Sequence, residues 1–229
     1  MNLVLFGSGE FTDSVDEIDK FLIKKYKPKN IAVIPTAAGL ESDVKKWIEM
    51  AQAHYAKFNL PVIPVPIFNK IQANDTNLTD LVLEADWIFF SGGSPNYLLE
   101  TLKDSKLWEK VLNRLDNGAL LSGSSAGAMV MGQYVLSPSL RSLISRPKTI
   151  WTDAFMLVDY TVIPHFDHFK KQPGLINKIL NIQITKAGSY LMGIDENTAI
   201  IIDQTKPIVL GLGGVEIHDI NGTRRLQPK

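Results

Sequence analysis

The ten residues from 119 to 128 read ALLSGSSAGA and decide how we interpret the whole chain. Their first part, Ala119 to Ser122, is a short and mostly apolar stretch typical of a buried strand. Gly123-Ser124-Ser125-Ala126-Gly127 follows, and residues 126–133 have helical spacing. A G-x-S-x-G sequence between a strand and a helix is typical of a nucleophile elbow, a tight turn that lifts a serine hydroxyl above a sheet. Ser125 is therefore our candidate nucleophile; the alternative is a Gly/Ser loop that merely turns the chain.

Short apolar runs alternate with longer amphipathic stretches on both sides of this motif. We predict strands at residues 3–6, 30–35, 61–67, 87–90 and 119–122, and helices at 14–26, 43–58, 78–84, 97–115 and 126–133. This alternation is typical of a parallel sheet with helices on both faces. We predict further strands at 157–163 and 190–194. The tail is rich in strands, at 198–203, 207–212 and 215–219, and this predicts a mixed sheet with an antiparallel C-terminal edge. We expect one α/β domain over residues 1–229, a three-layer sandwich with a mostly parallel central sheet.

Composition excludes several classes of protein. The 24 basic and 24 acidic residues cancel, so the chain has no overall positive charge with which to bind nucleic acid. It has no cysteine, which excludes disulfide scaffolds, thiolate zinc sites, iron–sulfur clusters and a cysteine nucleophile. No apolar run is long enough to span a membrane and no basic leader precedes residue 3, so we expect a cytoplasmic protein. We expect no cofactor and leave open whether the chain forms a homodimer.

A serine nucleophile needs a base, and the chain has four histidines. His54 falls within a predicted helix, where we expect it at the surface or partly buried. His218 lies near the polar end of a predicted strand, where we expect it to be exposed. His165 directly follows an apolar strand and a proline, and a fixed strand end positions a ring better than a loop does. His165 is therefore our candidate base. The His165/His168 pair lacks a third ligand, so we predict no metal site.

The orienting acid is less well determined by the sequence. Asp153, Asp159, Asp195 and Glu196 are the candidates. Asp195 and Glu196 are adjacent and follow a predicted strand, so their side chains should point to opposite sides. Only one of the two can face the same crevice as Ser125. Taken on spacing alone, they could also be a pair of solvated turn carboxylates.

A second glycine motif, Ser91-Gly92-Gly93-Ser94, follows the strand at 87–90. Two glycines let the main chain approach a substrate closely. The N–H of Gly93 could therefore join the N–H of Ala126 as an oxyanion donor. Phosphate binding is the alternative, but the motif lacks the lysine of a P-loop and the spacing of a dinucleotide site.

Taken together and in this order, these segments resemble the dipeptidase E and cyanophycinase family of serine peptidases, over roughly residues 1–215. The family has a fold similar to that of class I glutamine amidotransferases. The segments that carry the resemblance are Ile34-Pro35-Thr36-Ala37-Ala38, Phe90-Ser91-Gly92-Gly93 with Leu98-Leu99, Gly123-Ser124-Ser125-Ala126-Gly127-Ala128, Pro164-His165-Phe166 and Gly193-Ile194-Asp195-Glu196-Asn197-Thr198-Ala199.

The resemblance implies a serine peptidase or amidase that forms an acyl-enzyme on Ser125, with His165 as base and an oxyanion hole of Gly93 and Ala126. It favours Glu196 as the third member, with Asp195 and Asp153 as alternatives. Family members cleave small peptides after aspartate or cut the β-linked units of cyanophycin. The expected partner is therefore a small peptide or amide substrate.

The chain departs from the family where substrate should bind. Ser94-Pro95 follows the glycine motif where cyanophycinases have Asp-Gln, and Lys170-Lys171 stand where they have arginines. We take Ser94 and Lys170 as candidate substrate-binding residues. Lys170, Lys171 or Arg141 could bind a substrate carboxylate.

Two other functions fit the same motifs. An α/β-hydrolase esterase would use Ser125, Asp195 and His218, which occur in the chain order expected for that fold. A ligand-binding relative could keep the serine turn without any turnover.

Overall fold

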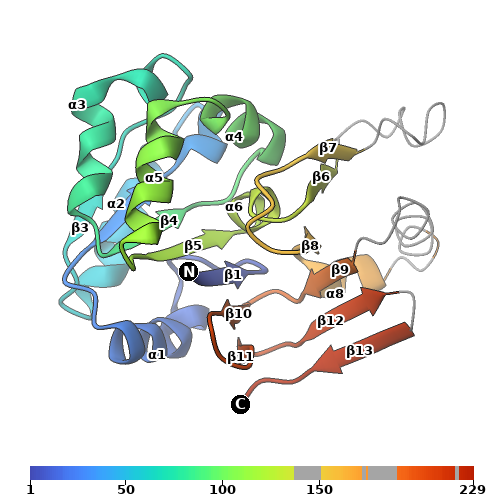
Figure 1. The fold of residues 1–229 in the computed structure, drawn as a ribbon. Helices are drawn as coiled ribbons and strands as arrows, with labels where there is room; N and C mark the ends of the chain where they lie inside the picture. The colour runs from blue at the N-terminus through green and yellow to red at the C-terminus, as the bar shows by residue number, and fades with distance from the viewer. Residues whose placement is uncertain (137–150, 172–173, 175–189, 220–221) are drawn as a thin grey trace.

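The computed structural model describes residues 1–136, 151–171, 174, 190–219 and 222–229 of the chain. A seven-stranded sheet forms its centre, in the order β11-β10-β1-β5-β4-β2-β3 (Figure 1). Five strands run parallel to one another, while β10 and β11 pair antiparallel at one edge. The strands are β1 (Asn2–Phe6), β2 (Ile31–Ile34), β3 (Val62–Pro64), β4 (Trp87–Phe90), β5 (Leu120–Ser124), β10 (Thr198–Ile202) and β11 (Ile208–Gly211).

Helices cover both faces of this sheet, because alternate strand residues point to opposite sides. On one face, Val4, Val33 and Phe89 share a hydrophobic cluster with side chains of α1 (Asp16–Tyr26) and α2 (Lys46–Ala56). On the other, Leu5 and Phe90 pack with side chains of α4 (Pro95–Leu102), α5 (Lys106–Asp116) and α6 (Ala126–Val130). The short helix α3 (Thr76–Thr79) contacts α5. The predicted three-layer α/β architecture is therefore confirmed.

A second, four-stranded sheet lies beside the antiparallel edge, in the order β13-β12-β9-β8 (Figure 1). Strands β8 (Tyr160–Ile163) and β9 (Tyr190–Ile194) are parallel, and β12 (Val215–Asp219) and β13 (Gly222–Leu226) are added antiparallel. A short helix, α8 (Phe166–Lys170), follows β8. A separate hairpin joins β6 (Tyr134–Leu136) to β7 (Trp151–Asp153).

The observed elements differ from the predicted ones in several places. The helix predicted over 97–115 is two helices, because the Ser105 hydroxyl accepts from the N–H of Trp108 and starts α5 anew. The helix predicted over 126–133 ends at Val130, and Gly132 then passes so close to Tyr160 that a side chain would not fit. The strand at 215–219 belongs to the second sheet, not to the edge of the first.

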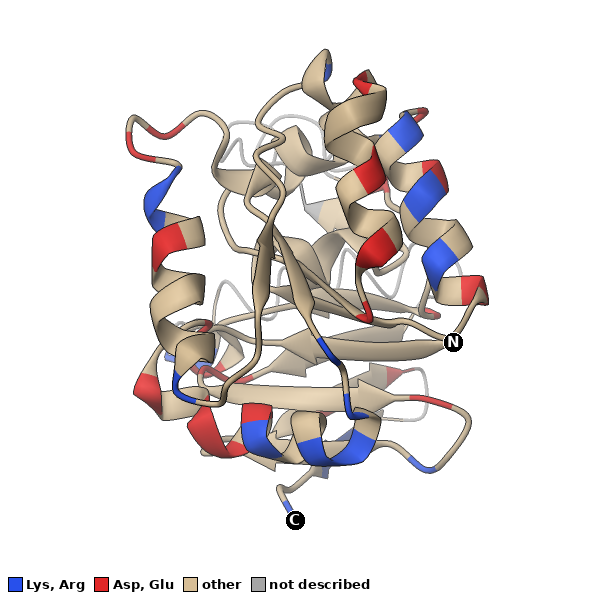
Figure 2. Ribbon diagram, turned by 90° about the vertical axis from the view of Figure 1, so that its left-hand side faces the viewer, with Lys and Arg blue, Asp and Glu red and all other residues tan. Residues whose placement is uncertain are grey.

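Acidic and basic residues are interspersed along the covering helices (Figure 2). Within the described ranges, no helix has both the length and the hydropathy that a membrane crossing requires.

Candidate active site

The turn between β5 and α6 holds Ser125 in a strained conformation. Its φ of 50° and ψ of −109° lie outside the regions that L-residues ordinarily occupy. Such a conformation costs on the order of 1–3 kcal/mol and persists only when the surroundings impose it. Here the Ser125 N–H donates to the Phe6 carbonyl at 3.1 Å, and the Ser125 carbonyl accepts from Met129 N–H at 3.0 Å. The sheet and the following helix therefore fix the turn from both sides.

Glycines flank the turn because neighbouring backbone occupies the space of a side chain. A Cβ at Gly123 would overlap the backbone of Gly127, and a Cβ at Gly127 would overlap the carbonyl oxygen of Phe90. The sequence motif thus has a steric cause in this fold, and the predicted turn lies where it was expected.

His165 reaches Ser125 from the second sheet. It follows β8, has a left-handed backbone (φ 51°) and begins α8. Its Nε2 lies 3.0 Å from Ser125 Oγ, within hydrogen-bonding distance. Its side chain is 37% exposed, so the ring faces the open side of the site.

Glu196 completes the series of hydrogen bonds. Its Oε1 lies 2.6 Å from Nδ1 of His165. The Glu196 N–H donates to Asp167 Oδ1 at 3.0 Å, which ties the loop after β9 to helix α8. Of the carboxylates considered from the sequence, the structure places Glu196 against the imidazole, whereas Asp153 is exposed on β7. A hydroxyl, an imidazole and a carboxylate therefore lie in the relative order of a serine triad.

Asp195 points the other way, as the alternation of side chains predicts. It is 4% exposed and is enclosed by ionic partners: Lys170 Nζ lies 3.1 Å from Oδ1, Arg225 Nη2 lies 2.6 Å from Oδ2, and Gly214 N–H donates to Oδ2. Burial alone would raise the pKa of Asp195, but these hydrogen bonds outweigh it and lower the pKa. Asp195 is part of an ion-pair network under the site.

We expect this network to weaken in acid. The pKa values of Asp195 and of Glu216, which also pairs with Lys170 and Arg225, lie below their ordinary values in the folded chain. A carboxylate with a lowered folded pKa contributes stability above its unfolded pKa and loses it as pH falls through the folded value. Denaturant titrations from about pH 7 to about pH 2 should therefore show the free energy of unfolding falling below about pH 5.

Asp195→Asn should remove part of the loss of stability in acid, because an asparagine side chain has no carboxylate to be protonated. It should also lower stability at neutral pH. A variant whose stability falls with acid as steeply as that of the unchanged protein would contradict the assignment.

The alternative esterase arrangement is not assembled. His218 Nδ1 lies 2.9 Å from the Thr223 hydroxyl, and its Nε2 lies 3.5 Å from Glu216. The expectation of an exposed ring was wrong: its side chain is 11% exposed and packs on Phe166, with ring centroids 5.5 Å apart. Burial lowers the pKa of His218. The structure brings His165, not His218, to Ser125.

The glycine loop after β4 lies beside Ser125. Gly93 has φ 137°, and a Cβ there would overlap the backbone of Ala37. The N–H of Ser94 donates to the Ala37 carbonyl at 2.8 Å, which holds the loop down. Ala126 is the first residue of α6, so its N–H has no carbonyl in a preceding turn of that helix.

The predicted substrate-binding side chains have other partners here. The Ser94 hydroxyl caps α4 by accepting from the N–H of Tyr97. Lys170 is paired with Asp195 and Glu216, so a substrate carboxylate would have to compete with both. Lys171 is exposed, and Arg141 lies outside the described residues.

Of the two remaining histidines, His54 differs from its expected setting. His54 on α2 is 3% exposed, not at the surface, and its Nε2 lies 2.7 Å from Oδ2 of Asp19 on α1. Burial raises the pKa of Asp19 despite the bond to His54. His168 Nε2 lies 3.2 Å from Glu196 Oε2. Asp167, His168 and Glu196 lie close enough together to approach one ion. However, Asp167 already accepts from the Glu196 N–H, and the Glu196 carboxylate is bound to His165.

Sequence reasoning missed one residue of the site, Glu10. It follows the first strand and is 8% exposed, with both carboxylate oxygens directed at the two glycine motifs. An acid two residues after Gly7-Ser8 at the end of a central strand was the available signal.

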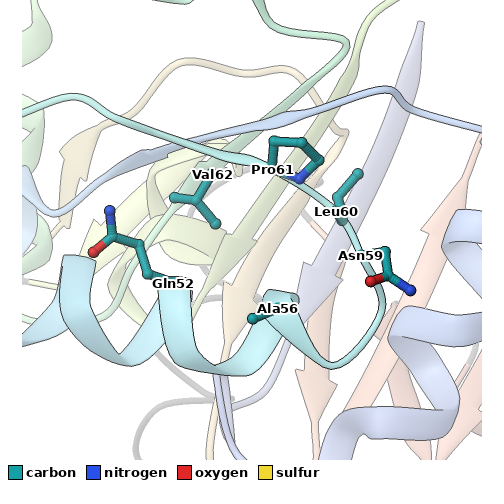
Figure 3. A pocket seen from close by; sticks show the side chains of 6 residues that line it. All are labelled: Gln52, Ala56, Asn59, Leu60, Pro61 and Val62. Atoms are coloured by element: carbon teal, nitrogen blue, oxygen red, sulfur yellow. The ribbon is translucent and has the colours of Figure 1, made fainter.

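A hollow between α2 and the segment that leads into β3 offers no comparable chemistry (Figure 3). It has a volume of about 490 Å³, and none of its lining side chains is titratable: Gln52, Ala56, Asn59, Leu60, Pro61 and Val62.

Comparison with known proteins agrees with this fold. A model described as peptidase family S51 matches residues 3–210, so the chain belongs to that family of serine peptidases. It is accordingly a peptidase with the glutamine amidotransferase-like α/β fold, and the family resemblance seen in the sequence is confirmed.

Individual relatives cover most of the chain. An uncharacterized peptidase of Pasteurella multocida is 26% identical over 90% of this chain and 97% of its own length. A cyanophycinase of Geminocystis herdmanii is 29% identical over 82% of this chain and 69% of its own length. A crystal structure of a peptidase from an acI-B1 actinobacterium superposes with a TM-score of 0.85 and 31% identity, covering 99% of this chain and 94% of that one.

Proposed function

We propose that the chain hydrolyses small peptides or amides through an acyl-enzyme on Ser125. The observation that carries the proposal is the continuous contact from Ser125 Oγ to His165 Nε2 at 3.0 Å and from His165 Nδ1 to Glu196 at 2.6 Å. A base hydrogen-bonded to the nucleophile and oriented by a third group is the arrangement that activates a serine.

In the proposed first step, Ser125 Oγ attacks the substrate carbonyl carbon while His165 Nε2 takes the hydroxyl proton. The negative charge that develops on the carbonyl oxygen is stabilised by the N–H groups of Gly93 and Ala126. Glu196 stabilises the imidazolium and holds Nδ1 protonated. When the tetrahedral intermediate collapses, the C–N bond breaks and His165 returns the proton to the leaving amine.

In the second step, a water molecule attacks the Ser125 ester and gives one proton to His165. The carbon–Oγ bond breaks, the proton returns to Oγ, and the acid product leaves. No external oxidant or cofactor enters this sequence of steps.

The names of the relatives support a small peptide as substrate. A protein named peptidase E from Actinobacillus pleuropneumoniae is 22% identical over 92% of this chain, and the Geminocystis herdmanii relative is named cyanophycinase. Cleavage after aspartate is the specificity to test first, although the residues at 94–95 and 170–171 depart from the family pattern.

A dipeptide library tests the proposal, with Ser125→Ala as the blank. We expect turnover by the unchanged protein, none by Ser125→Ala, and covalent labelling of Ser125 by a fluorophosphonate. His165→Ala should lose turnover, whereas His218→Ala should keep it. The reverse result would restore the esterase arrangement. A folded protein that neither cleaves nor labels would be a non-catalytic relative.

A further inference from the structure

A buried carboxylate connects the two loops that flank Ser125. Glu10 lies in the loop after β1 and is 8% exposed. Its Oε1 accepts from the N–H of Gly92 at 2.8 Å, and its Oε2 lies 2.5 Å from the Ser124 hydroxyl. Both oxygens are thus bound to groups in the immediate neighbourhood of the nucleophile.

The two partners come from two neighbouring strands of the central sheet. Gly92 is the second residue after β4, and Ser124 is the last residue of β5, directly before Ser125. Since the sheet order is β1-β5-β4, the Glu10 side chain reaches from the end of one strand across the ends of the next two. It therefore joins the glycine loop to the serine turn.

The glycine loop also lies directly against Ser125. A Cβ built on Gly92 would be 2.8 Å from Glu10 Oε1 and 3.5 Å from Ser125 Cβ. Glu10 binds the N–H of Gly92, so that N–H is not directed at substrate. The next N–H along the chain, that of Gly93, is the one we assign to the oxyanion, and its direction depends on how the peptide before it is held.

Burying a carboxylate is costly unless hydrogen bonds compensate for the lost water. Among the described residues, Glu10 is bound by one main-chain N–H and one hydroxyl, both belonging to the site. Buried polar groups of this kind fix a geometry when they are fully satisfied. Nothing about the triad itself requires an acid at this position.

We propose that Glu10 is a positioning residue that holds the Gly92–Gly93 peptide at the distance from Ser125 that oxyanion binding needs. This inference rests on the proposed function for its kinetic consequence, though not for its structural one. Because the oxyanion exists only in the transition state, loss of Glu10 should lower kcat and leave KM nearly unchanged.

Three substitutions of Glu10 distinguish the effect of its side-chain length from the effect of its charge. Glu10→Gln keeps the length, and its amide can accept from Gly92 N–H and donate to Ser124. Glu10→Asp keeps the charge but is one methylene too short to reach both groups, and Glu10→Ala removes both bonds. We expect Gln to stay within about threefold of the unchanged kcat, and Asp and Ala to fall about 10²-fold, as for loss of one oxyanion donor.

Amide hydrogen exchange supplies a readout that needs no activity. The Ser94 N–H donates to Ala37, not to Glu10, so it reports whether the loop as a whole is held. It should exchange faster in the Asp and Ala variants and at the unchanged rate in the Gln variant. Asp86→Ala is the matched control, because Asp86 accepts the N–H of Lys29 at the opposite end of β4. It should alter neither kcat nor Ser94 exchange.

The outcomes are distinct. If the unchanged protein cleaves no peptide, the proposed function is refuted. Hydrogen exchange at Ser94 would still test the role of Glu10. Unchanged kcat and unchanged exchange in both Asp and Ala variants would overturn the inference. A Gln variant as slow as Ala, with normal exchange, would also overturn it, since charge and not position would then be what Glu10 contributes. If Ala fails to fold, the Gln and Asp pair decides alone.

Discussion

Glu196→Gln should lower kcat by about 10⁴-fold while leaving the fold intact. Glutamine has the same length as glutamate, but its amide carries no charge to stabilise the imidazolium and can hold the wrong tautomer by donating to Nδ1 of His165. Loss of an orienting carboxylate in a serine triad costs about this much. The 2.6 Å contact with His165 is what makes so large an effect expected. Burst kinetics with a chromogenic amide and circular dichroism would measure rate and fold together.

Asp153→Asn and Asp195→Asn are the matched substitutions for the two other acids that the sequence offered. Asp153 is exposed on β7, so Asp153→Asn should change neither the rate nor the stability. Asp195 is enclosed by Lys170 and Arg225, so Asp195→Asn should lower the stability of the fold more than it lowers the rate. If Asp195→Asn proved 10⁴-fold slower at full stability while Glu196→Gln stayed active, the proposed triad would be wrong.

Local pattern was sufficient to predict most of the central sheet. The runs at 3–6, 31–34 and 87–90 are continuously apolar because both faces of a parallel strand are buried, and each became a strand. The serine turn was also predictable, because the G-x-S-x-G motif lies between an apolar strand and a helix, although the Phe90 carbonyl that requires Gly127 lies far away in the sequence. Parallel strands place their ends at one edge, which explains why the glycine loop and the serine turn meet.

Features that depend on distant contacts were not predictable. The second sheet depends on the pairing of β9 with β12, and the residue pattern of neither strand indicates its partner. His54 is buried because Asp19, thirty-five residues away, accepts from its ring. Glu10 resembles an ordinary loop acid until its partners at 92 and 124 are known. It was predictable that the side chains of Asp195 and Glu196 point to opposite sides. Which of the two faces His165 depends on where β8 and β9 lie relative to Ser125.

Gly93→Ala should damage activity strongly although it adds a single methyl group. Gly93 has φ 137°, a conformation that alanine rarely adopts, and a Cβ there would overlap the Ala37 carbonyl that holds Ser94. The loop must shift to relieve the overlap, which moves the proposed oxyanion donor away from Ser125. We expect kcat to fall by about 10³-fold, at the upper end for loss of one such donor.

Gly118→Ala distinguishes steric overlap from backbone strain alone. Gly118 also has a positive φ, 90°, but nothing lies within 4 Å of the place its Cβ would occupy. It should therefore lose only the strain energy, about 1–2 kcal/mol, or a few degrees in Tm for a chain of this length, at unchanged kcat. Gly93→Ala should lose more in Tm as well as in rate. Equal losses in the two variants, or an active Gly93→Ala, would mean that the Gly93 peptide does not bind the oxyanion, because a displaced donor cannot leave the rate of acyl transfer unaltered.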